Sequence, residues 1–334
     1  MSEDRELQFS IIIPVYNRPK EIEALLGTLT EQTDPDFEVL VVEDGSEDRC
    51  EDEVRQFEDE LRVRYLYKEN TGPGQTRNYG AERADGNYIV FFDSDCLIPP
   101  EYIETVREAL TSTWADVYGG PDRAHPSFTP IQKAINYTMT SILTTGGIRG
   151  EERRAASFKP RSFNMGIDAQ AFADVGGFPP MGIYGEDLDL SLRLQRAGYS
   201  TRLLPDAYVY HKRRSSFIPF FRQVFRIGEA RMTLHRLHPG SLKLVHTLPS
   251  IAVFLAVVLL IGAATGQPLF LIPLVVGAVV LFGDAWRQTR SPRIASLALV
   301  ASGIQISGYG LGFLKGVWRH TFGLYDDPAD PSSE

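Results

Sequence analysis

Two aspartates, Asp93 and Asp95, stand directly after the apolar run at residues 89–92. A short apolar run of this kind predicts a buried strand, so both carboxylates would lie at a strand end. Paired carboxylates suit a hard divalent cation, which takes oxygen ligands and bridges readily to phosphate. Aspartate is also common in turns, and the pair taken by itself favours an ordinary turn.

Other side chains along the chain suit a phosphorylated ligand. Tyr16 and Asn17 follow a β-branched run, and Asp44 follows an apolar one. A carboxylate such as Asp44 can accept a hydrogen bond from a nucleobase or a ribose, and Arg77 offers a cationic fork to a phosphate. A nucleoside diphosphate with a metal ion would satisfy all of these groups. The chain has neither the glycine fingerprint of dinucleotide-binding folds after its first strand nor a P-loop motif.

The elements that must position these groups alternate between strands and helices. Strands are predicted at residues 9–15, 37–42, 63–67 and 88–92, and helices at 19–30, from the second strand to about 61, and at 76–83. This alternation predicts an α/β fold with crossover connections and a mainly parallel sheet. Ligands bind beyond the carboxyl ends of such strands, so the groups at the strand ends should converge on one crevice.

The composition divides the chain into unlike parts. Residues 1–120 hold 28 acidic and 11 basic residues, a net charge of −17, whereas residues 211–243 hold eight lysines and arginines and one acid. An acidic head followed by a basic collar is typical of a protein bound to an anionic membrane face, and we expect no nucleic-acid partner. Two cysteines imply no disulfide framework and suit a reducing compartment, and the hydrophilic start shows no cleavable secretory signal.

Three uncharged apolar runs follow the collar, at residues 244–264, 267–283 and 294–314. The first is long enough to cross a hydrocarbon core of about 30 Å. The alternative is a set of buried core helices in a soluble domain, which the closeness of three such runs disfavours. Arginines after the second run place the collar in the cytoplasm by the positive-inside rule, and the topology of the third run stays open.

The segment at residues 216–237 mixes phenylalanines with arginines. This mixture predicts an amphipathic helix lying in the membrane interface. A basic face on an ordinary helix is the alternative.

The first two-thirds of the chain resembles family 2 glycosyltransferases, which have the Rossmann-like GT-A fold. The resemblance rests on an ordered set of segments within residues 9–211: Ser10-Ile-Ile-Ile-Pro-Val-Tyr-Asn17, Val41-Val-Glu-Asp-Gly-Ser46, Gly72-Pro-Gly-Gln-Thr-Arg-Asn78, Asp93-Ser-Asp95, Asn164-Met165, Gly176-Gly-Phe178 and Gly185-Glu-Asp187. Each segment is modest alone, but the ordered set is specific. Glu43-Asp44 departs mildly from the Asp-Asp pair of the family.

The resemblance implies a site for a nucleotide sugar and a divalent metal, Mg²⁺ or Mn²⁺. Residues lining the nucleotide would be Pro14, Tyr16, Asn17, Asp44, Arg77 and Asp93, and the metal ligands would be Asp93, Asp95 and His211. Asn164 and Met165 would meet the donor or acceptor sugar. His211 also adjoins Lys212-Arg213-Arg214, so it can equally be part of the basic collar.

Asp187 would be the general base that deprotonates the acceptor hydroxyl, with Glu186 beside it in the catalytic site, at the start of a helix. Acids at a helix N-terminus are also simply good capping residues. Gln223 and Arg226 resemble part of the Q-x-x-R-W element of processive members and would contact the diphosphate. Ile227 replaces the tryptophan, which favours a single addition over polymerisation.

The expected architecture is therefore a GT-A catalytic domain at residues 1–213, a basic interfacial segment at 214–243, transmembrane helices at 244–320 and a flexible tail at 321–334. We expect a metal-dependent, inverting hexosyltransferase at the cytoplasmic face of a bacterial inner membrane, acting on a lipid-linked glycan or similar acceptor of cell-envelope polysaccharide assembly. The alternatives are a polyprenyl-phosphate glycosyltransferase, a processive polysaccharide synthase and a non-catalytic membrane protein that binds nucleotide sugars.

Overall fold

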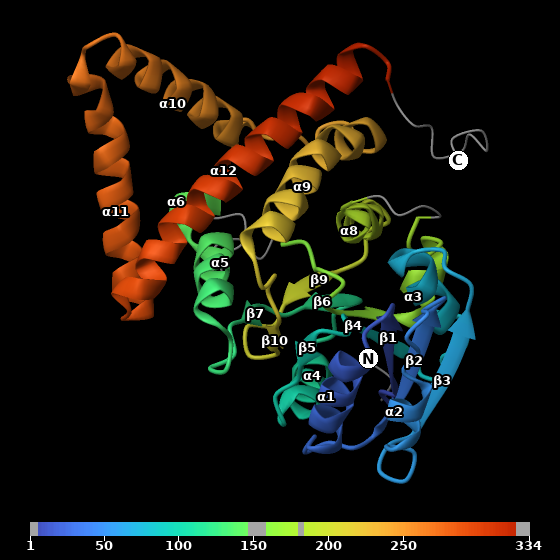
Figure 1. Ribbon diagram of the computed structural model, residues 1–334. Coiled ribbons are helices and arrows are strands. Elements are labelled where there is room, and N and C mark those ends of the chain that lie inside the picture. Colours follow the sequence, from blue (N-terminus) through green and yellow to red (C-terminus); the bar gives the residue numbers. More distant parts are fainter. Residues whose placement is uncertain (1–5, 146–157, 180–183, 325–334) are drawn as a thin grey trace. The chain divides into compact units, whose positions relative to one another are not determined.

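The computed structural model describes residues 6–145, 158–179 and 184–324 of the 334-residue chain (Figure 1). These residues form two compact units. The first runs to His125 and is completed by the later segment that ends at Lys212. The second combines the segment that begins at Pro126 with everything described from Arg213 onward. The second unit therefore holds both the segment predicted to be interfacial and the apolar tail.

A seven-stranded sheet forms the centre of the first unit, in the order β3-β2-β1-β4-β8-β6-β9. Its strands are β1 (Phe9–Val15), β2 (Phe37–Asp44), β3 (Val63–Lys68), β4 (Tyr88–Phe92), β6 (Val117–Gly119), β8 (Asn164–Asp168) and β9 (Thr201–Leu203). Strands β3, β2, β1 and β4 are parallel, as are β6 and β9, whereas β8 is antiparallel to both of its neighbours. The predicted α/β fold with a mainly parallel sheet is confirmed.

The register of the parallel strands brings their carboxyl ends to one edge. Phe9 pairs with Phe37 on one side and with Tyr88 on the other, so β1, β2 and β4 start level. Their residues are apolar on both faces and almost all buried, as expected for strands covered on both sides. The groups that follow Val15, Val42 and Phe92 therefore lie at the same edge.

Helices cover the sheet (Figure 1). They are α1 (Pro19–Thr30), α2 (Glu51–Arg55), α3 (Pro73–Ala81), α4 (Tyr102–Ser112), α7 (Ala169–Asp174) and α8 (Glu186–Arg196). In α1, Ile22, Leu25, Leu26 and Leu29 are buried at helical spacing. The helix predicted to reach about residue 61 is shorter than expected and ends at Arg55, because Glu58-Asp59-Glu60 would put three negative charges at the helix C-terminus.

A small second sheet adjoins the carboxyl edge of the main one, in the order β5-β10-β7. Its strands are β5 (Cys96–Leu97), β10 (Val209–His211) and β7 (Asp122–Arg123). His211 pairs with Cys96, and Val209 pairs with Asp122. This small sheet therefore brings residues from three distant parts of the chain next to the end of β4.

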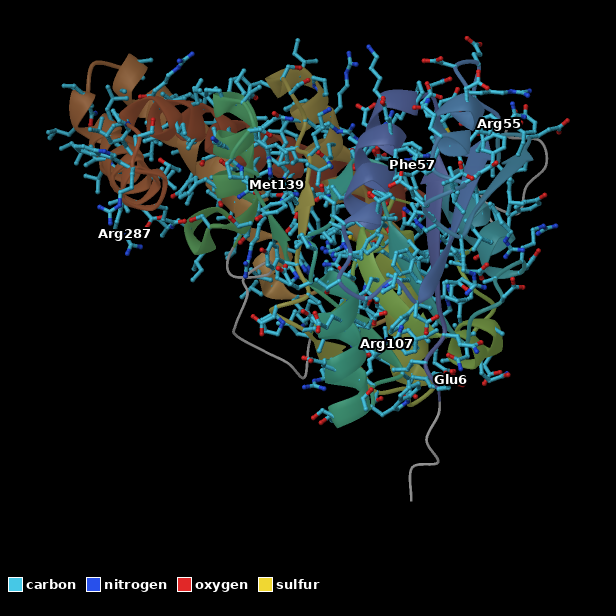
Figure 2. All side chains as sticks on the ribbon, turned by 90° about the horizontal axis from the view of Figure 1, so that it is seen from below. Glu6, Arg55, Phe57, Arg107, Met139 and Arg287 are labelled. Atoms are coloured by element: carbon cyan, nitrogen blue, oxygen red, sulfur yellow. The ribbon has the colours of Figure 1, made fainter. Side chains whose placement is uncertain are left out.

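The second unit is helical in its described residues. Its elements are α5 (Pro130–Thr140), α6 (Ile142–Thr145), α9 (Phe217–Leu237), η2 (Leu244–His246), α10 (Leu248–Ala264), η3 (Pro268–Leu271), α11 (Ile272–Thr289) and α12 (Pro292–Thr321). Two stretches are long and apolar enough to cross a membrane, Pro268–Thr289 and Pro292–Thr321, and α10 is a shorter apolar helix. Arg287, labelled in Figure 2, has a side chain that is 75% exposed near the end of α11.

Helices α9 and α12 pack closely along each other, and glycines make this possible. A Cβ atom on Gly312 would lie 2.0 Å from the backbone oxygen of Phe225, and one on Gly228 would lie 2.2 Å from that of Tyr309. Phe220 and Val224 are buried on the same helix, α9. The apolar side of α9 thus packs against protein, and its placement in a membrane interface stays a prediction.

Candidate active site

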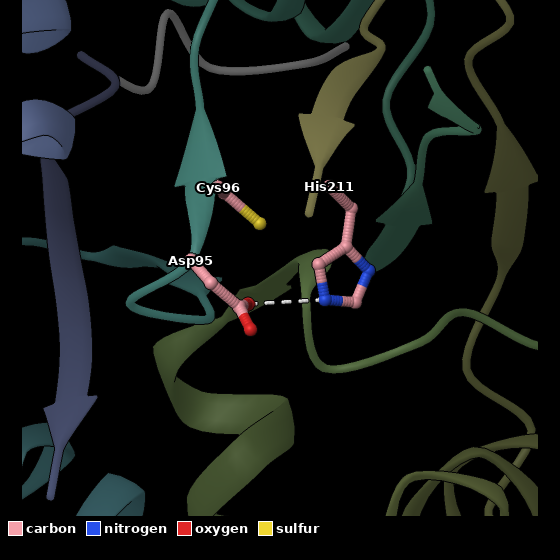
Figure 3. Close-up of side chains that lie close together, drawn as sticks. All are labelled: Asp95, Cys96 and His211. Carbon is pink, nitrogen blue, oxygen red and sulfur yellow. Dashed lines mark ion pairs between the residues drawn. The ribbon is translucent and has the colours of Figure 1, made fainter. Parts of the chain in front are cut away.

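The acid pair lies beside a histidine from the small sheet. His211 Nε2 lies 3.1 Å from Asp95 Oδ1 and 3.9 Å from Asp93 Oδ2. Figure 3 draws the ion pair between His211 and Asp95. The pairing of β10 with β5 fixes this arrangement, and the backbone N–H of Lys212 donates a 3.0 Å hydrogen bond to the carbonyl of Asp95. The structure brings together the three residues that the sequence predicted as metal ligands.

The atoms at this point fit a divalent cation. Asp95 Oδ1 is buried and accepts no hydrogen bond of good geometry from the described residues, although it faces His211 Nε2. Cys96 Sγ lies within 4.8 Å of both ligand atoms, but its thiol is directed at the carbonyl of Phe163, 3.6 Å away. Burial, and then the nearby Asp95, raise the pKa of Cys96. Carboxylate oxygen, which suits Mg²⁺ and Mn²⁺, and imidazole nitrogen, which suits a transition metal, remain, so the donor set fits Mn²⁺ better than Mg²⁺.

Asp95 contacts Arg18 as well as His211. Arg18 Nη1 donates a 2.6 Å hydrogen bond to its Oδ2 atom. Burial would raise the pKa of Asp95, but His211 and then Arg18 outweigh that effect and hold the pKa well below its usual range. On the far side of the imidazole, Asp122 Oδ2 lies 3.8 Å from His211 Nδ1, where a carboxylate can orient the ring.

Arg77 joins the acid pair to helix α8. Its Nη2 atom donates to Asp93 Oδ1 at 2.6 Å, and its Nη1 atom donates to Glu186 Oε1 at 2.7 Å. The guanidinium is buried and packs over the ring of Phe178, 5.3 Å from its centroid. Burial raises the pKa of Glu186, and the charge of Arg77 opposes this shift. Gly74 leaves the space that Glu186 needs, because a Cβ atom there would lie 2.6 Å from Oε2.

Asp187 is the next residue on α8. Gly185, with φ of 95°, turns the chain into the helix, and the backbone N–H of Leu188 donates to Asp187 Oδ1 at 2.8 Å. Arg161 Nη1 donates to Asp187 Oδ2 at 3.2 Å. The Asp187 side chain remains 16% exposed, so a substrate can reach it. The guanidinium and the backbone N–H fix the orientation of this carboxylate.

Asp44 is already bonded by three donors. Lys68 Nζ lies 2.6 Å from Oδ1, the backbone N–H of Thr71 donates to the same oxygen, and that of Gly72 donates to Oδ2. Gly72 has φ of 88°, a conformation that favours glycine. This carboxylate therefore holds the loop between β3 and α3 in place. Its predicted contact with a nucleobase stays a prediction.

The end of β1 provides an exposed aromatic ring on a fixed loop. Tyr16 is 52% exposed, and Pro14, one residue inside the strand end, is partly buried. Asn17 takes the left-handed conformation, and its Oδ1 atom accepts from the backbone N–H groups of Glu47 and Asp48. These hydrogen bonds connect the loops after β1 and β2. The exposed ring of Tyr16 could stack on a planar ligand such as a nucleobase.

Two predicted residues of the first unit do not join this cluster in the described geometry. Asn164 and Met165 lie on β8 with fully buried side chains, and the amide of Asn164 bonds the carbonyl of Ala207 and the hydroxyl of Tyr102. Their contacts support the fold, and their role in sugar binding stays a prediction. Gln223 and Arg226 lie on α9 in the second unit, and their contact with a diphosphate stays a prediction.

Sequence reasoning missed three charged partners at this edge. Arg18 and Lys68 follow or end strands β1 and β3, so the same strand-end argument that selected Asp44 would have selected them. Arg161 comes from an irregular segment before β8 and carries no such signal. The edge therefore holds acids in alternation with arginines and a lysine.

Residues 10–171 match the model of Glycosyl transferase family 2. The chain thus contains a family 2 glycosyltransferase domain. Among its relatives is Glycosyltransferase AglE of Haloferax volcanii, 29% identical over 72% of this chain and 78% of the relative. Validoxylamine A glucosyltransferase of Streptomyces hygroscopicus subsp. jinggangensis is 30% identical, over 57% of this chain and 51% of its own length. Succinoglycan biosynthesis protein ExoA of Rhizobium meliloti is 26% identical over 69% and 72%.

A solved structure confirms the fold of this glycosyltransferase. It is the mannosyltransferase PcManGT from Pyrobaculum calidifontis in complex with GDP-Man and Mn²⁺. The two structures superpose with a TM-score of 0.66 over 94% of this chain and 88% of that chain, at 18% identity. The GT-A fold predicted from the sequence is therefore confirmed, and the family match with its named relatives confirms the glycosyltransferase class.

Proposed function

We propose that this glycosyltransferase moves a sugar from a nucleotide sugar to a hydroxyl group of a membrane-associated acceptor, with inversion and with a divalent cation bound. The observation that carries the proposal is the meeting of Asp93 and Asp95 with His211 at the carboxyl edge, where Arg77 joins Asp93 to the start of α8. The proposed metal ligands are thus connected through Arg77 and Glu186 to Asp187, the candidate base. PcManGT, which shares the fold, holds Mn²⁺ together with its donor GDP-Man.

A divalent cation at Asp93, Asp95 and His211 would neutralise the charge that develops on the diphosphate leaving group. Asp187 takes the proton of the acceptor hydroxyl while that oxygen attacks the anomeric carbon from the face opposite the nucleotide. The bond from the anomeric carbon to the diphosphate oxygen breaks, and the nucleoside diphosphate leaves. Arg161, 3.2 Å from Asp187, orients that carboxylate toward the acceptor.

The proposal of a membrane-associated acceptor is based on the apolar helices of the second unit. Most apolar side chains of α11 are exposed rather than packed against described residues, which suits a lipid environment. Arg290 lies between α11 and α12, and Arg293 lies in the first turn of α12, on the side that the positive-inside rule assigns to the cytoplasm. A relative is named for succinoglycan biosynthesis, which supports a glycan as the acceptor. We expect the chain to resist extraction of membranes with alkaline carbonate, and its release would argue against membrane insertion.

The donor and the metal are tested together on the purified full chain in detergent. It is given a panel of nucleotide sugars and a membrane lipid extract, with Mn²⁺ or with EDTA, and released nucleoside diphosphate is measured. We expect release from one donor, only with the cation, and its loss in Asp95→Asn. Asp52→Asn, on an exposed side chain of α2, is the matched control and should behave as wild type. Equal release in EDTA would overturn the metal-dependent reaction.

A further inference from the structure

Arg18 is fixed next to the predicted metal ligands by its position in the chain. It follows Asn17, whose left-handed backbone is held by hydrogen bonds to the loop after β2. It precedes Pro19, the first residue of α1, which disfavours the helical conformation for the residue before it, and Arg18 has φ of −143° and ψ of 52°. The backbone of Arg18 is therefore pinned on both sides, and its side chain is directed at the end of β4.

The two oxygens of Asp95 have different surroundings. Oδ2 accepts the 2.6 Å hydrogen bond from Arg18, whereas Oδ1 faces His211 and accepts no hydrogen bond of good geometry from the described residues. A cation would therefore bind at Oδ1, with the guanidinium of Arg18 on the other oxygen of the same carboxylate. Two positive groups so close repel each other strongly in a partly buried site. Arg18 opposes the binding of metal alone.

A diphosphate changes this balance. The Arg18 side chain is 34% exposed, so a ligand at the edge can reach it. An anionic diphosphate bound to the metal would contact the guanidinium as well, because arginine forms paired hydrogen bonds with phosphate oxygens. Repulsion between two cations then becomes attraction of both to one anion.

We propose that Arg18 couples metal binding to nucleotide binding, so that the cation binds tightly only together with a diphosphate. This inference rests on the proposed function, since it requires a cation at Asp95. It goes beyond that function because it makes Arg18 the residue through which metal affinity depends on the bound nucleotide. Coupling between two ligands is reciprocal, so Arg18 must raise the affinity for each ligand in the presence of the other.

The test measures Mn²⁺ affinity directly, from the free-ion signal in electron paramagnetic resonance, without any turnover. The full-length protein is titrated with Mn²⁺ alone, then with UDP or with GDP present. In Arg18→Gln we expect Mn²⁺ alone to bind about fivefold more tightly, and the gain from the nucleotide to shrink by about tenfold. Arg18→Lys keeps the charge and should keep most of the coupling. Arg55→Gln removes an exposed arginine that pairs with Glu51 on α2, and it should match wild type (Figure 2).

The outcomes separate the two proposals. If wild type binds no Mn²⁺ with either nucleotide, the metal site of the proposed function fails. If wild type binds Mn²⁺ and the coupling is unchanged in Arg18→Gln, only the role of Arg18 is overturned. Arg18→Met, which keeps the aliphatic stem without the charge, carries the same test if Arg18→Gln does not fold.

Discussion

Arg77 is the buried cation on which two acidic segments depend. It bonds Asp93 after β4 and Glu186 at the start of α8, and its guanidinium is almost fully enclosed. Loss of one partner from a buried ion pair leaves uncompensated charge. We therefore expect Arg77→Ala to lower the free energy of unfolding by about 3–5 kcal/mol, measured by urea unfolding. Arg55→Ala removes an exposed arginine and should change it by less than about 0.5 kcal/mol. Equal effects of the two variants would show that the Arg77 bridge contributes nothing.

Asp95 gives a prediction that depends on pH. Its pKa is lower in the folded chain than in the unfolded chain, because His211 and Arg18 outweigh the effect of burial. The stabilisation is therefore present above the unfolded pKa near 4 and is lost as the pH falls through the folded value. In EDTA, Asp95→Asn should lose about 2 kcal/mol at pH 7, and its difference from wild type should shrink below about pH 4. A difference that stays constant with pH would contradict this electrostatic account.

For single residues, the sequence indicated the acidic residues of the site but not the basic residues that contact them. Strand-end position selected Asp44 and the pair after β4, since the carboxyl edge of a parallel sheet collects such groups. Which cation meets which acid depends on how loops return to that edge. The bond from Arg77 to Glu186 joins residues 109 positions apart, and no local pattern predicts it.

Among the elements, the contact between α9 and α12 was the least visible in the sequence. Glycines at residues 303, 308, 310 and 312 make the third apolar run look like a weak membrane span, and Gly316 follows that run. Of these, the glycines at residues 308, 312 and 316 line one contact. In the structure they recur every four residues, so they share one face of α12, and this face packs against α9. Periodicity predicted the bounds of β1, α1 and β4, whereas this packing depends on residues that have no side chain.

Gly312→Ala tests that contact. The new methyl group would lie 2.0 Å from the backbone oxygen of Phe225, so the helices must separate. Overpacking of this kind costs about 1–3 kcal/mol, and the thermal unfolding midpoint in detergent should fall. Gly303→Ala is the matched control, because nothing lies within 4 Å of its added atom and alanine favours the helix. A Gly312→Ala variant as stable as Gly303→Ala would show that α9 and α12 do not pack as described.

The whole molecule combines a GT-A unit with a helical unit that includes two candidate membrane spans. Charge and hydropathy along the chain predicted this division in outline. They did not predict that α5 and α6, from the middle of the sequence, would join the helical unit. These two helices are short and of mixed polarity. No local sequence pattern shows which unit they join, because tertiary contacts alone decide it. The predicted extent of the catalytic domain, residues 1–213, stays a prediction.

The central claim is that Asp187 deprotonates an acceptor hydroxyl in a metal-assisted transfer, and one variant tests it most directly. Asp187→Asn keeps the shape of the side chain but removes the base. With the donor identified from the panel, donor affinity and transfer rate are measured for wild type and variant at saturating Mn²⁺. We predict donor affinity within about twofold of wild type and a transfer rate lower by about 10²–10⁴-fold. Transfer at the wild-type rate would contradict the account, and it would indicate an acceptor that is already anionic, such as a lipid phosphate.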